Sequence, residues 1–348
     1  MEFARRGHEI LFVNPPDPSL TSVKIHSTQY PTLQTLTYPR PWFHKLRFHA
    51  RPLYDFLMKR QVRSILRQAG FQLDVCWCFD FNLYSDLSVF GAKVNIFHPV
   101  DPLSEPEHLK PTKNADLVFT VSNRIAESLN DPRAESIGHA LSKPFADLAT
   151  ARLTSLTPVK ISDPINVGYA GNLMRKPLNR QVVRKVIEGH PNVRFHFWGP
   201  YEVDDSEAGR FVAYLDNAPH VTLHGRVEPE QLADALQTVD LLLLVYGLDQ
   251  AESDRSNSHK LLEYLSTGRT TVCSRIDEYV QHPDLIEMPS SGDDDEIPEL
   301  FADVIIRLSE TNSVERAKAR IEFSLNHTYT EKAEQIESMI MHVLDSGE

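Results

Sequence analysis

Short apolar runs alternate with amphipathic stretches along most of the chain. The runs that fit β-strands are residues 9–13, 75–79, 94–98 and 116–122 in the first half, and 165–170, 193–198, 221–224, 241–246 and 270–274 in the second. Strands that alternate with helical segments are typical of parallel sheets covered by helices. The pattern therefore predicts an α/β protein with one sheet in each half.

The length of the chain favours two domains. With 348 residues, of which 41% are hydrophobic, each half can bury a core of its own. Residues 141–164 contain three prolines and little periodicity. We expect an N-terminal domain over 1–150, a linker over 151–164, a C-terminal domain over 165–325 and a terminal helix within 326–348.

Charge and cysteine content exclude several classes of protein. A net charge of −12 argues against general nucleic-acid binding, which needs a basic face. No apolar run approaches the roughly 20 residues that span a bilayer. Three cysteines do not make a disulfide framework, and Cys76-Trp77-Cys78 fits a buried strand better than a metal site. We expect a cytoplasmic protein, with peripheral contact to the inner face of the membrane as a further option.

One stretch departs from the acidic average. Residues 40–67 hold eight cations and a single carboxylate, Asp55, a net charge of +7, and the cations are interleaved with aromatic residues. Residues 53–68 fit one helix with Leu57, Ile65 and Leu66 on its apolar side. Two interpretations stay open: contact with an anionic membrane surface, or a helix that packs on the N-terminal sheet with its cations in solvent.

Doubly wound sheets bind ligands at the carboxyl ends of their strands, so the loops there are the first place to look for chemistry. After the strand that ends at residue 170 come Gly171, Asn172, Arg175 and Lys176, and Pro177 fits the first position of a helix. Glycine permits close backbone approach, and the two cations with a helix N-terminus suit a diphosphate. The alternative is an ordinary turn with surface cations.

The segment 256–268 is the most informative. Ser258 or its neighbour Asn257 caps a predicted helix that ends at Gly268, and Lys260 and Glu263 share one face of it. Lys260 would meet a phosphate and Glu263 a pair of ribose hydroxyls. The alternative is a surface ion pair between the two.

The order of several motifs in the second half resembles the donor domain of GT-B glycosyltransferases. These motifs are VGYAGN at 167–172, FWGP at 197–200, VTLHGRV at 221–227, the apolar strand 240–246 and KLLEYL at 260–265 followed by Gly268. The combination is similar to family 4-like bacterial enzymes and to xanthan-type glucuronosyltransferases.

That resemblance implies two doubly wound Rossmann-like domains facing a central cleft, with a nucleoside-diphosphate sugar on the C-terminal one. It places the donor-binding residues at Gly171, Asn172, Arg175, Lys176, Tyr246, Ser258, His259, Lys260 and Glu263. It also implies a glycan or polyprenyl-linked acceptor and a role in surface polysaccharide synthesis. We expect no metal or other cofactor, because Arg175, Lys176, Lys260 and two helix N-termini can together stabilise the departing diphosphate.

The first half carries a looser resemblance. Residues 95–101, NIFHPVD, resemble the strand and loop whose aspartate is the catalytic base of the inverting xanthan-type enzymes, which implies Asp101 as the base. His98 is the second candidate. Residues 116–122 and 137–141 resemble the family's strand ending in serine and the turn that closes its N-terminal domain.

Two departures from the family bear on mechanism. The glutamate that retaining family 4 enzymes carry eight positions before the residue matched by Glu263 is Arg255 here. Glu252 and Asp254 are near but out of register, which favours an inverting reaction. The start of the chain resembles the end of the family's first helix and its second strand, so the first strand of the N-terminal domain is expected to be missing.

Two other functions remain open at this point. A nucleotide-sugar epimerase would share the GT-B architecture, and a catalytically inert partner protein would fit the shortened N-terminal domain. A nicotinamide-dependent dehydrogenase does not fit, because neither half has a G-x-G-x-x-G turn after its first strand. The acidic run at 293–296 is expected to be a solvated loop that leads into a helix.

Overall fold

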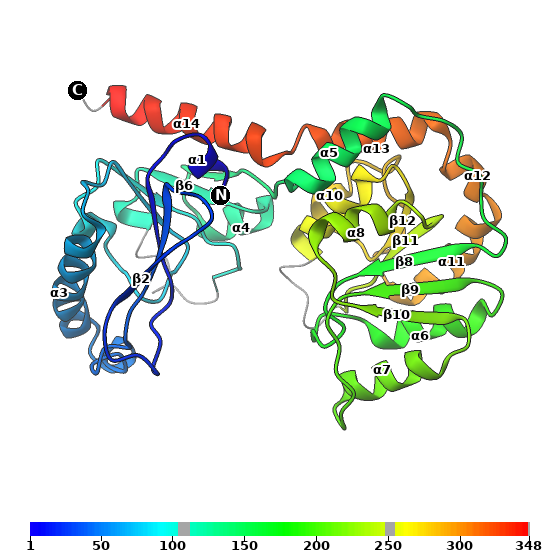
Figure 1. Cartoon of the computed structure of the whole chain (residues 1–348), viewed down its shortest axis with the longest axis horizontal. Helices are drawn as coiled ribbons and strands as arrows, with labels where there is room; N and C mark the ends of the chain where they lie inside the picture. Colours follow the sequence, from blue (N-terminus) through cyan, green and yellow to red (C-terminus); the bar gives the residue numbers. More distant parts are fainter. Residues whose placement is uncertain (104–111, 248–254, 347–348) are drawn as a thin grey trace. The chain divides into compact units, whose positions relative to one another are not determined.

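The computed structural model describes residues 1–103, 112–247 and 255–346. The chain forms two compact units: unit 1 comprises Met1–Ile137 and Lys332–Glu348, and unit 2 comprises Gly138–Glu331. Unit 1 is drawn in blue and cyan with most of the red C-terminal helix, and unit 2 in green to orange (Figure 1). Each unit contains a parallel sheet, so the predicted α/β class is confirmed; unit 1 has a second sheet in addition to the one predicted for each half.

The larger sheet of unit 1 is fully parallel, in the order β4-β5-β6-β7. Its strands are β4 (Val75–Cys78), β5 (Val94–Phe97), β6 (Leu117–Thr120) and β7 (Ala134–Ser136), with the short helix η1 (Leu87–Phe90) between β4 and β5. Helix α4 (Asn123–Leu129) starts directly after β6, where the Ser122 hydroxyl accepts a hydrogen bond from the Ile125 N–H. Every residue of β5 is buried, which explains why its sequence is an unbroken apolar run apart from Asn95.

A second, three-stranded sheet lies at the start of unit 1. Strand β1 (Ile10–Val13) pairs in parallel with β3 (Leu33–Thr37), and β2 (Lys24–Ser27) pairs antiparallel with β3. We expected residues 9–13 to join the main sheet of the first half, which is wrong. The strand instead uses a partner only about twenty positions away, and short helix α1 (Glu2–Arg5) precedes it.

The basic stretch forms α2 (Leu46–His49) and α3 (Arg51–Ala69), which ends at Gly70 in the left-handed conformation. Tyr54, Met58, Val62 and Ile65 are buried, and their spacing of three or four residues marks one face of α3. The predicted apolar side, Leu57, Ile65 and Leu66, is correct for Ile65, while the other two are partly buried. One face of α3 is therefore packed against the rest of unit 1.

Unit 2 contains a five-stranded parallel sheet in the order β10-β9-β8-β11-β12. Its strands are β8 (Asn166–Ala170), β9 (Arg194–Trp198), β10 (Val221–Gly225), β11 (Leu241–Leu244) and β12 (Thr270–Cys273). The chain enters at β8, runs outward to β10, and then returns to the other side of β8. The direction of winding reverses between β8 and β11, and doubly wound sheets bind ligands outside the carboxyl ends at this point.

Helices lie on both sides of this sheet; α5 and α13 are on one side and α6 and α7 on the other (Figure 1). The helices are α5 (Lys143–Leu153), α6 (Arg180–Gly189), α7 (Glu207–Asn217), α8 (Pro229–Leu236), α10 (His259–Ser266), α11 (Ile297–Ile306), α12 (Leu308–Thr311) and α13 (Val314–Leu325), with short helices η4 (Asp277–Tyr279) and η5 (Asp294–Glu296). The last helix, α14 (Tyr329–Ser346), begins in unit 2 and continues into unit 1, where Ile336 packs with Val94 and Ile96.

Two boundaries differ from those predicted. The units divide after Ile137, whereas the predicted domain boundary is residue 150, because α5 packs against α8, α10 and α13 of unit 2. Pro177 does not start a helix. Helix α6 begins at Arg180, and the Asn179 side chain caps it by accepting a hydrogen bond from the Val182 N–H at 3.2 Å.

Within the described residues, no helix is both long and apolar enough to cross a membrane. The same part of the chain holds no group of three or more His, Cys, Asp or Glu side chains arranged to bind a metal ion. Cys76 and Cys78 are buried in β4 as predicted, and burial raises the pKa of each thiol to about 12.

Candidate functional site

Three glycine turns lie side by side at the carboxyl edge of the unit 2 sheet. The Gly171 N–H donates to the Trp198 carbonyl at 2.8 Å, and the Gly199 N–H donates to the Gly225 carbonyl at 2.8 Å. Gly199 has φ +141°, and a Cβ there would lie 2.0 Å from the Gly171 carbonyl oxygen. Only glycine therefore lets the loops after β8 and β9 run this close together.

The loop after β8 is held in shape from inside the protein. The Asn172 side chain accepts a hydrogen bond from the backbone N–H two residues later, at 2.8 Å. The buried Arg180 donates to the carbonyls of Leu173 and Arg175, at 3.0 and 2.7 Å. The side chains of Arg175 and Lys176 are exposed on this ordered loop. Sequence reasoning missed Arg180, although a cation among the apolar positions of α6 is a signal for such a role.

Four predicted residues meet where α10 begins. Lys260 is only 9% exposed, and its Nζ donates to the Tyr246 hydroxyl at 3.3 Å. The Tyr246 hydroxyl is also hydrogen bonded to Ser258 Oγ at 3.0 Å. A Cβ on Gly171 would lie 3.1 Å from Lys260 Cε, so the lysine stem rests against the glycine turn. Ser258 occupies the predicted N-cap position, but its side chain makes no capping hydrogen bond.

Tyr264 fixes α10 against the central strand. Its ring is fully buried, and its hydroxyl accepts a hydrogen bond from the Ala170 N–H at 2.7 Å. Ala170 is the last residue of β8, directly before Gly171. The hydrogen bond therefore fixes the position of α10 relative to the glycine turn. Sequence reasoning did not assign Tyr264 a role, because a tyrosine on the apolar face of a helix is usually a residue of the hydrophobic core.

His259 adds a neutral imidazole to this region. Its side chain is exposed, its ring centroid lies 5.8 Å from that of His139, and surrounding protein lowers its pKa to about 4, helped by the charges of Lys260, His139 and Arg175. At neutral pH the ring is uncharged, and it offers one donor and one acceptor beside a group of cations.

Glu263 lies one turn further along α10. Burial raises the pKa of its carboxyl to about 7, and the positive charge of Lys260 opposes the shift without cancelling it. Burial raises the pKa of Tyr329, and the charge of Glu263 raises it further. The predicted pair is therefore no surface ion pair: Lys260 is buried and Glu263 is half-buried, titrating near neutral pH.

Arg255, the residue that the sequence resemblance matches to the glutamate of retaining family 4 enzymes, is buried. Its Nη1 lies 3.0 Å from both carboxylate oxygens of Asp294 and donates to the Tyr246 carbonyl at 2.9 Å. This ion pair ties the end of the β11 segment to η5. The acidic run 293–296 is therefore not simply a solvated loop, because Asp294 is buried as the partner of Arg255. Glu252 and Asp254 lie outside the described residues.

The two candidate bases are in unit 1, after β5. His98 is buried among aromatic rings, with ring centroids 5.2 Å from Phe79, 5.8 Å from Trp77 and 6.1 Å from Phe119. Asp101 lies three residues further on and is exposed. Both follow the carboxyl end of a parallel strand, as predicted, but only Asp101 presents its side chain to solvent.

Comparison with known proteins supports the fold. No protein-family model matches the chain, and no curated protein matches it in sequence. Sucrose-phosphate synthase from Thermosynechococcus elongatus is similar in structure, with a TM-score of 0.66, 13% identity, and coverage of 99% of this chain and 91% of that chain. HepE from Anabaena, in complex with UDP and glucose, gives a TM-score of 0.63 and 15% identity over 90% of this chain and 87% of that one.

A trehalose-6-phosphate synthase studied for glycosyl transfer with retention gives a TM-score of 0.62 at 11% identity, over 95% of this chain and 93% of that one. Identities this low establish the fold and nothing finer. The chain has the GT-B fold, with two Rossmann-like α/β units, as the sequence predicted.

Proposed function

We propose that this protein is a glycosyltransferase that takes a sugar from a nucleoside-diphosphate sugar bound to unit 2. The observation that carries the proposal is the buried Lys260, which rests on the Gly171 turn at the point where the winding of the sheet reverses. Lys260 lies in the first turn of α10, with its side chain against the Gly171 loop, and phosphates bind at helix N-termini beside such glycine loops.

The residues around Lys260 fit the parts of such a donor. The diphosphate would lie between Lys260 and the loop that carries Arg175 and Lys176, beside the first turn of α10. Glu263, a turn further along, would accept hydrogen bonds from the ribose hydroxyls. The matched HepE structure contains UDP, which supports a uridine nucleotide as the first donor to test.

We further propose that the diphosphate leaves without help from a metal ion. Three cationic side chains and the N-terminus of α10 are available to stabilise the developing charge, which is the term that usually dominates such catalysis. The neutral His259 adds a hydrogen-bond donor beside them.

Calorimetric titration with UDP tests the donor site. Lys260→Ala should weaken UDP binding by about ten- to a hundred-fold, because a charge-assisted contact contributes about 1.5–3 kcal/mol. Lys318→Ala, which removes an exposed lysine of α13 in the same unit, is the matched control and should bind normally. The titrations are run with EDTA, so that binding also reports on metal independence. Equal affinities in wild type and Lys260→Ala would exclude this site.

For the transfer itself we propose an inverting displacement with Asp101 as the base, onto a glycan or polyprenyl-linked acceptor. Arg255 supports this, because the sequence has an arginine, paired with Asp294, at the position that the resemblance matches to the retaining family's glutamate. The matched trehalose-6-phosphate synthase is described as transferring with retention, which makes retention the alternative mechanism. The product's anomeric configuration distinguishes the two.

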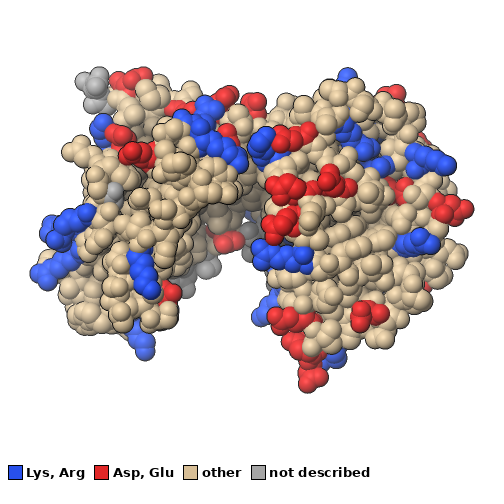
Figure 2. All heavy atoms as spheres, viewed as in Figure 1, with Lys and Arg blue, Asp and Glu red and all other residues tan. Residues whose placement is uncertain are grey.

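A polyprenyl-linked acceptor would bring the protein to a membrane. The solvent-exposed side of the basic stretch, residues 40–67, has the composition of a surface that binds an anionic membrane. Opposite its buried face, α3 exposes Leu53 and Phe56 together with Lys59, Arg60 and Arg63, and the nearby Trp42 is 86% exposed. Figure 2 shows Lys and Arg side chains along the edge of unit 1 that α3 occupies in Figure 1. Exposed apolar groups with cations beside them are typical of surfaces that bind anionic lipid.

Vesicle co-sedimentation tests this surface. Lys59→Gln should weaken binding to vesicles that contain phosphatidylserine by about fivefold, since one cation near such a surface contributes about 1 kcal/mol. Lys93→Gln, which removes an exposed lysine elsewhere in unit 1, should have no effect. If the wild-type protein does not bind vesicles that contain phosphatidylserine, the proposed membrane contact through this surface is excluded.

A further inference from the structure

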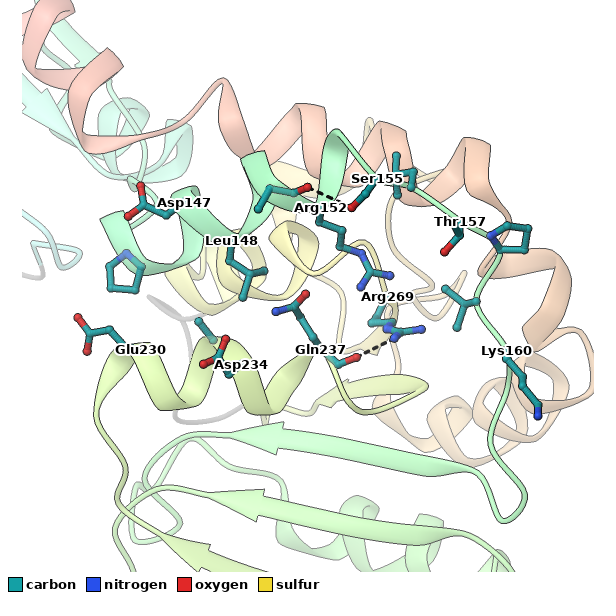
Figure 3. A pocket seen from close by; sticks show the side chains of 16 residues that line it. Asp147, Leu148, Arg152, Ser155, Thr157, Lys160, Glu230, Asp234, Gln237 and Arg269 are labelled. Atoms are coloured by element: carbon teal, nitrogen blue, oxygen red, sulfur yellow. Dashed lines mark hydrogen bonds between the residues drawn. The ribbon is translucent and has the colours of Figure 1, made fainter.

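A cavity of about 730 Å³ opens on unit 2 away from the glycine turns. It lies between α5, the residues that follow α5, and α8, with Arg269 at its floor (Figure 3). Gln237 and Arg269 stand shortly before β11 and β12, so this end of the cavity is at the amino edge of the sheet. The candidate donor site follows the carboxyl ends of the same strands, which makes the two sites separate.

Two arginines point toward each other in this cavity (Figure 3). Arg269 donates from Nη2 to the Gln237 carbonyl at 2.7 Å. Its Nε and Nη1, and Nε of Arg152, are buried and have no hydrogen-bond partner among the described residues. Neither guanidinium forms an ion pair in that part of the chain. Burial lowers the pKa of both groups, and the charge of Arg152 lowers that of Arg269 further, to about 10. The charge of Asp240 opposes the shift of Arg269 without cancelling it.

Two positive charges that lie close together and are partly shielded from water raise the free energy of the folded chain, and a bound anion offsets this cost. Guanidinium groups present fixed pairs of N–H donors that match phosphate oxygens. Lys160 also lines this end of the cavity. The cationic end is therefore built to receive a phosphate group.

The opposite end of the cavity has the opposite charge. Asp147, Glu230 and Asp234 line it, and Figure 3 shows them on the far side of the cavity from the two arginines. Asp147 is paired with Lys143 at 2.8 Å, so Glu230 and Asp234 supply most of the negative charge. Carboxylates accept hydrogen bonds from hydroxyl groups and repel a second anion. A volume of this size is in the range of small-molecule sites.

We propose that this cavity is a second ligand site, which binds a phosphate monoester of a hydroxyl-rich small molecule such as a sugar phosphate. The phosphate contacts Arg152 and Arg269, and the hydroxyls face the three carboxylates. This site is independent of the donor site and of the proposed transferase activity.

Calorimetric titration with ribose 5-phosphate, inorganic phosphate and ribose, at matched ionic strength in chloride, tests the proposal. Ribose 5-phosphate should bind more tightly than inorganic phosphate, and ribose should not bind. Arg152→Gln and Arg269→Gln should each weaken ribose 5-phosphate binding at least about tenfold. Arg194→Gln, which removes an exposed arginine of β9 outside the cavity, is the matched control.

Lys260→Ala separates the two sites, because it should leave ribose 5-phosphate binding unchanged even where it abolishes UDP binding. Melting temperatures without ligand confirm that each variant is folded. Equal affinity for ribose 5-phosphate in wild type, Arg152→Gln and Arg269→Gln would overturn the proposal. So would binding no tighter than that of inorganic phosphate, or binding that is lost in Lys260→Ala.

Discussion

Replacing Asp101 with asparagine should lower turnover by about a hundred- to ten-thousand-fold and leave the affinity for UDP unchanged. The amide keeps the shape of the side chain but cannot take a proton from the acceptor hydroxyl. Asp101 is exposed on the loop after β5, in unit 1, while the proposed donor site is in unit 2. Loss of turnover without loss of donor binding is therefore the specific signature of a base that serves the acceptor.

Two measurements make this prediction decisive. Asp74→Asn, which alters an exposed aspartate elsewhere in unit 1, should keep full turnover. Nuclear magnetic resonance of the product should give an anomeric configuration opposite to that of the donor. A fully active Asp101→Asn enzyme would remove Asp101 from the reaction and move attention to His98, whose buried ring would need a path to the acceptor. A retained configuration would exclude the single displacement.

Measuring UDP release with and without an acceptor separates a transferase from an epimerase. A transferase releases UDP from the donor only when an acceptor is present, whereas an epimerase acts on the nucleotide sugar alone. Release that does not depend on any acceptor would favour the epimerase, and UDP binding without turnover on any acceptor would favour a catalytically inert partner.

The parallel strands were predictable because their apolar runs are continuous. The β11 segment reads Leu-Leu-Leu-Leu and each of its residues is buried, so the pattern alone gives a strand covered on both faces. The polar loops between these runs then locate the carboxyl edge, which is how Gly171 and Lys260 were selected from positions far apart in the sequence. Their close approach in the structure is consistent with that selection.

Features that depend on a distant partner were not predictable. Nothing in the local sequence pairs Arg255 with Asp294, so the acidic run appeared solvated. The strand at 9–13 has the right composition for the main sheet, but its choice of β3 as a partner is a property of the folded unit. The arginine pair also depends on distant partners. Arg152 and Arg269 are 117 positions apart in the sequence, and packing of α5 against the rest of unit 2 brings them to one cavity.

Glu263→Gln should stabilise the protein above pH 7 while weakening its affinity for UDP. The carboxyl has a pKa of about 7 in the folded chain, against an ordinary value of 4.5. The folded state thus holds a proton that the unfolded state has lost, and the free energy of unfolding falls as pH rises from about 4.5 to about 7. Glutamine cannot ionise, so at pH 8 the variant should be more stable by about 2–3 kcal/mol.

Urea denaturation at pH 5 and pH 8 measures this effect, with Glu310→Gln, which alters an exposed glutamate of α12, as the control. The gain should be largest at pH 8 and several-fold smaller at pH 5, where folded wild-type Glu263 keeps its proton and the pH is only slightly above the pKa of the unfolded carboxyl.

Binding should change in the opposite direction. An ionised Glu263 is the better acceptor for ribose hydroxyls, so wild-type affinity for UDP should rise between pH 6 and pH 8 more steeply than that of Glu263→Gln. At pH 8 the variant should bind UDP about tenfold more weakly, the loss expected for one charge-assisted hydrogen bond. Parallel pH profiles would show that Glu263 does not meet the nucleotide. A variant that is both less stable and weaker in binding would show that the carboxyl serves the fold.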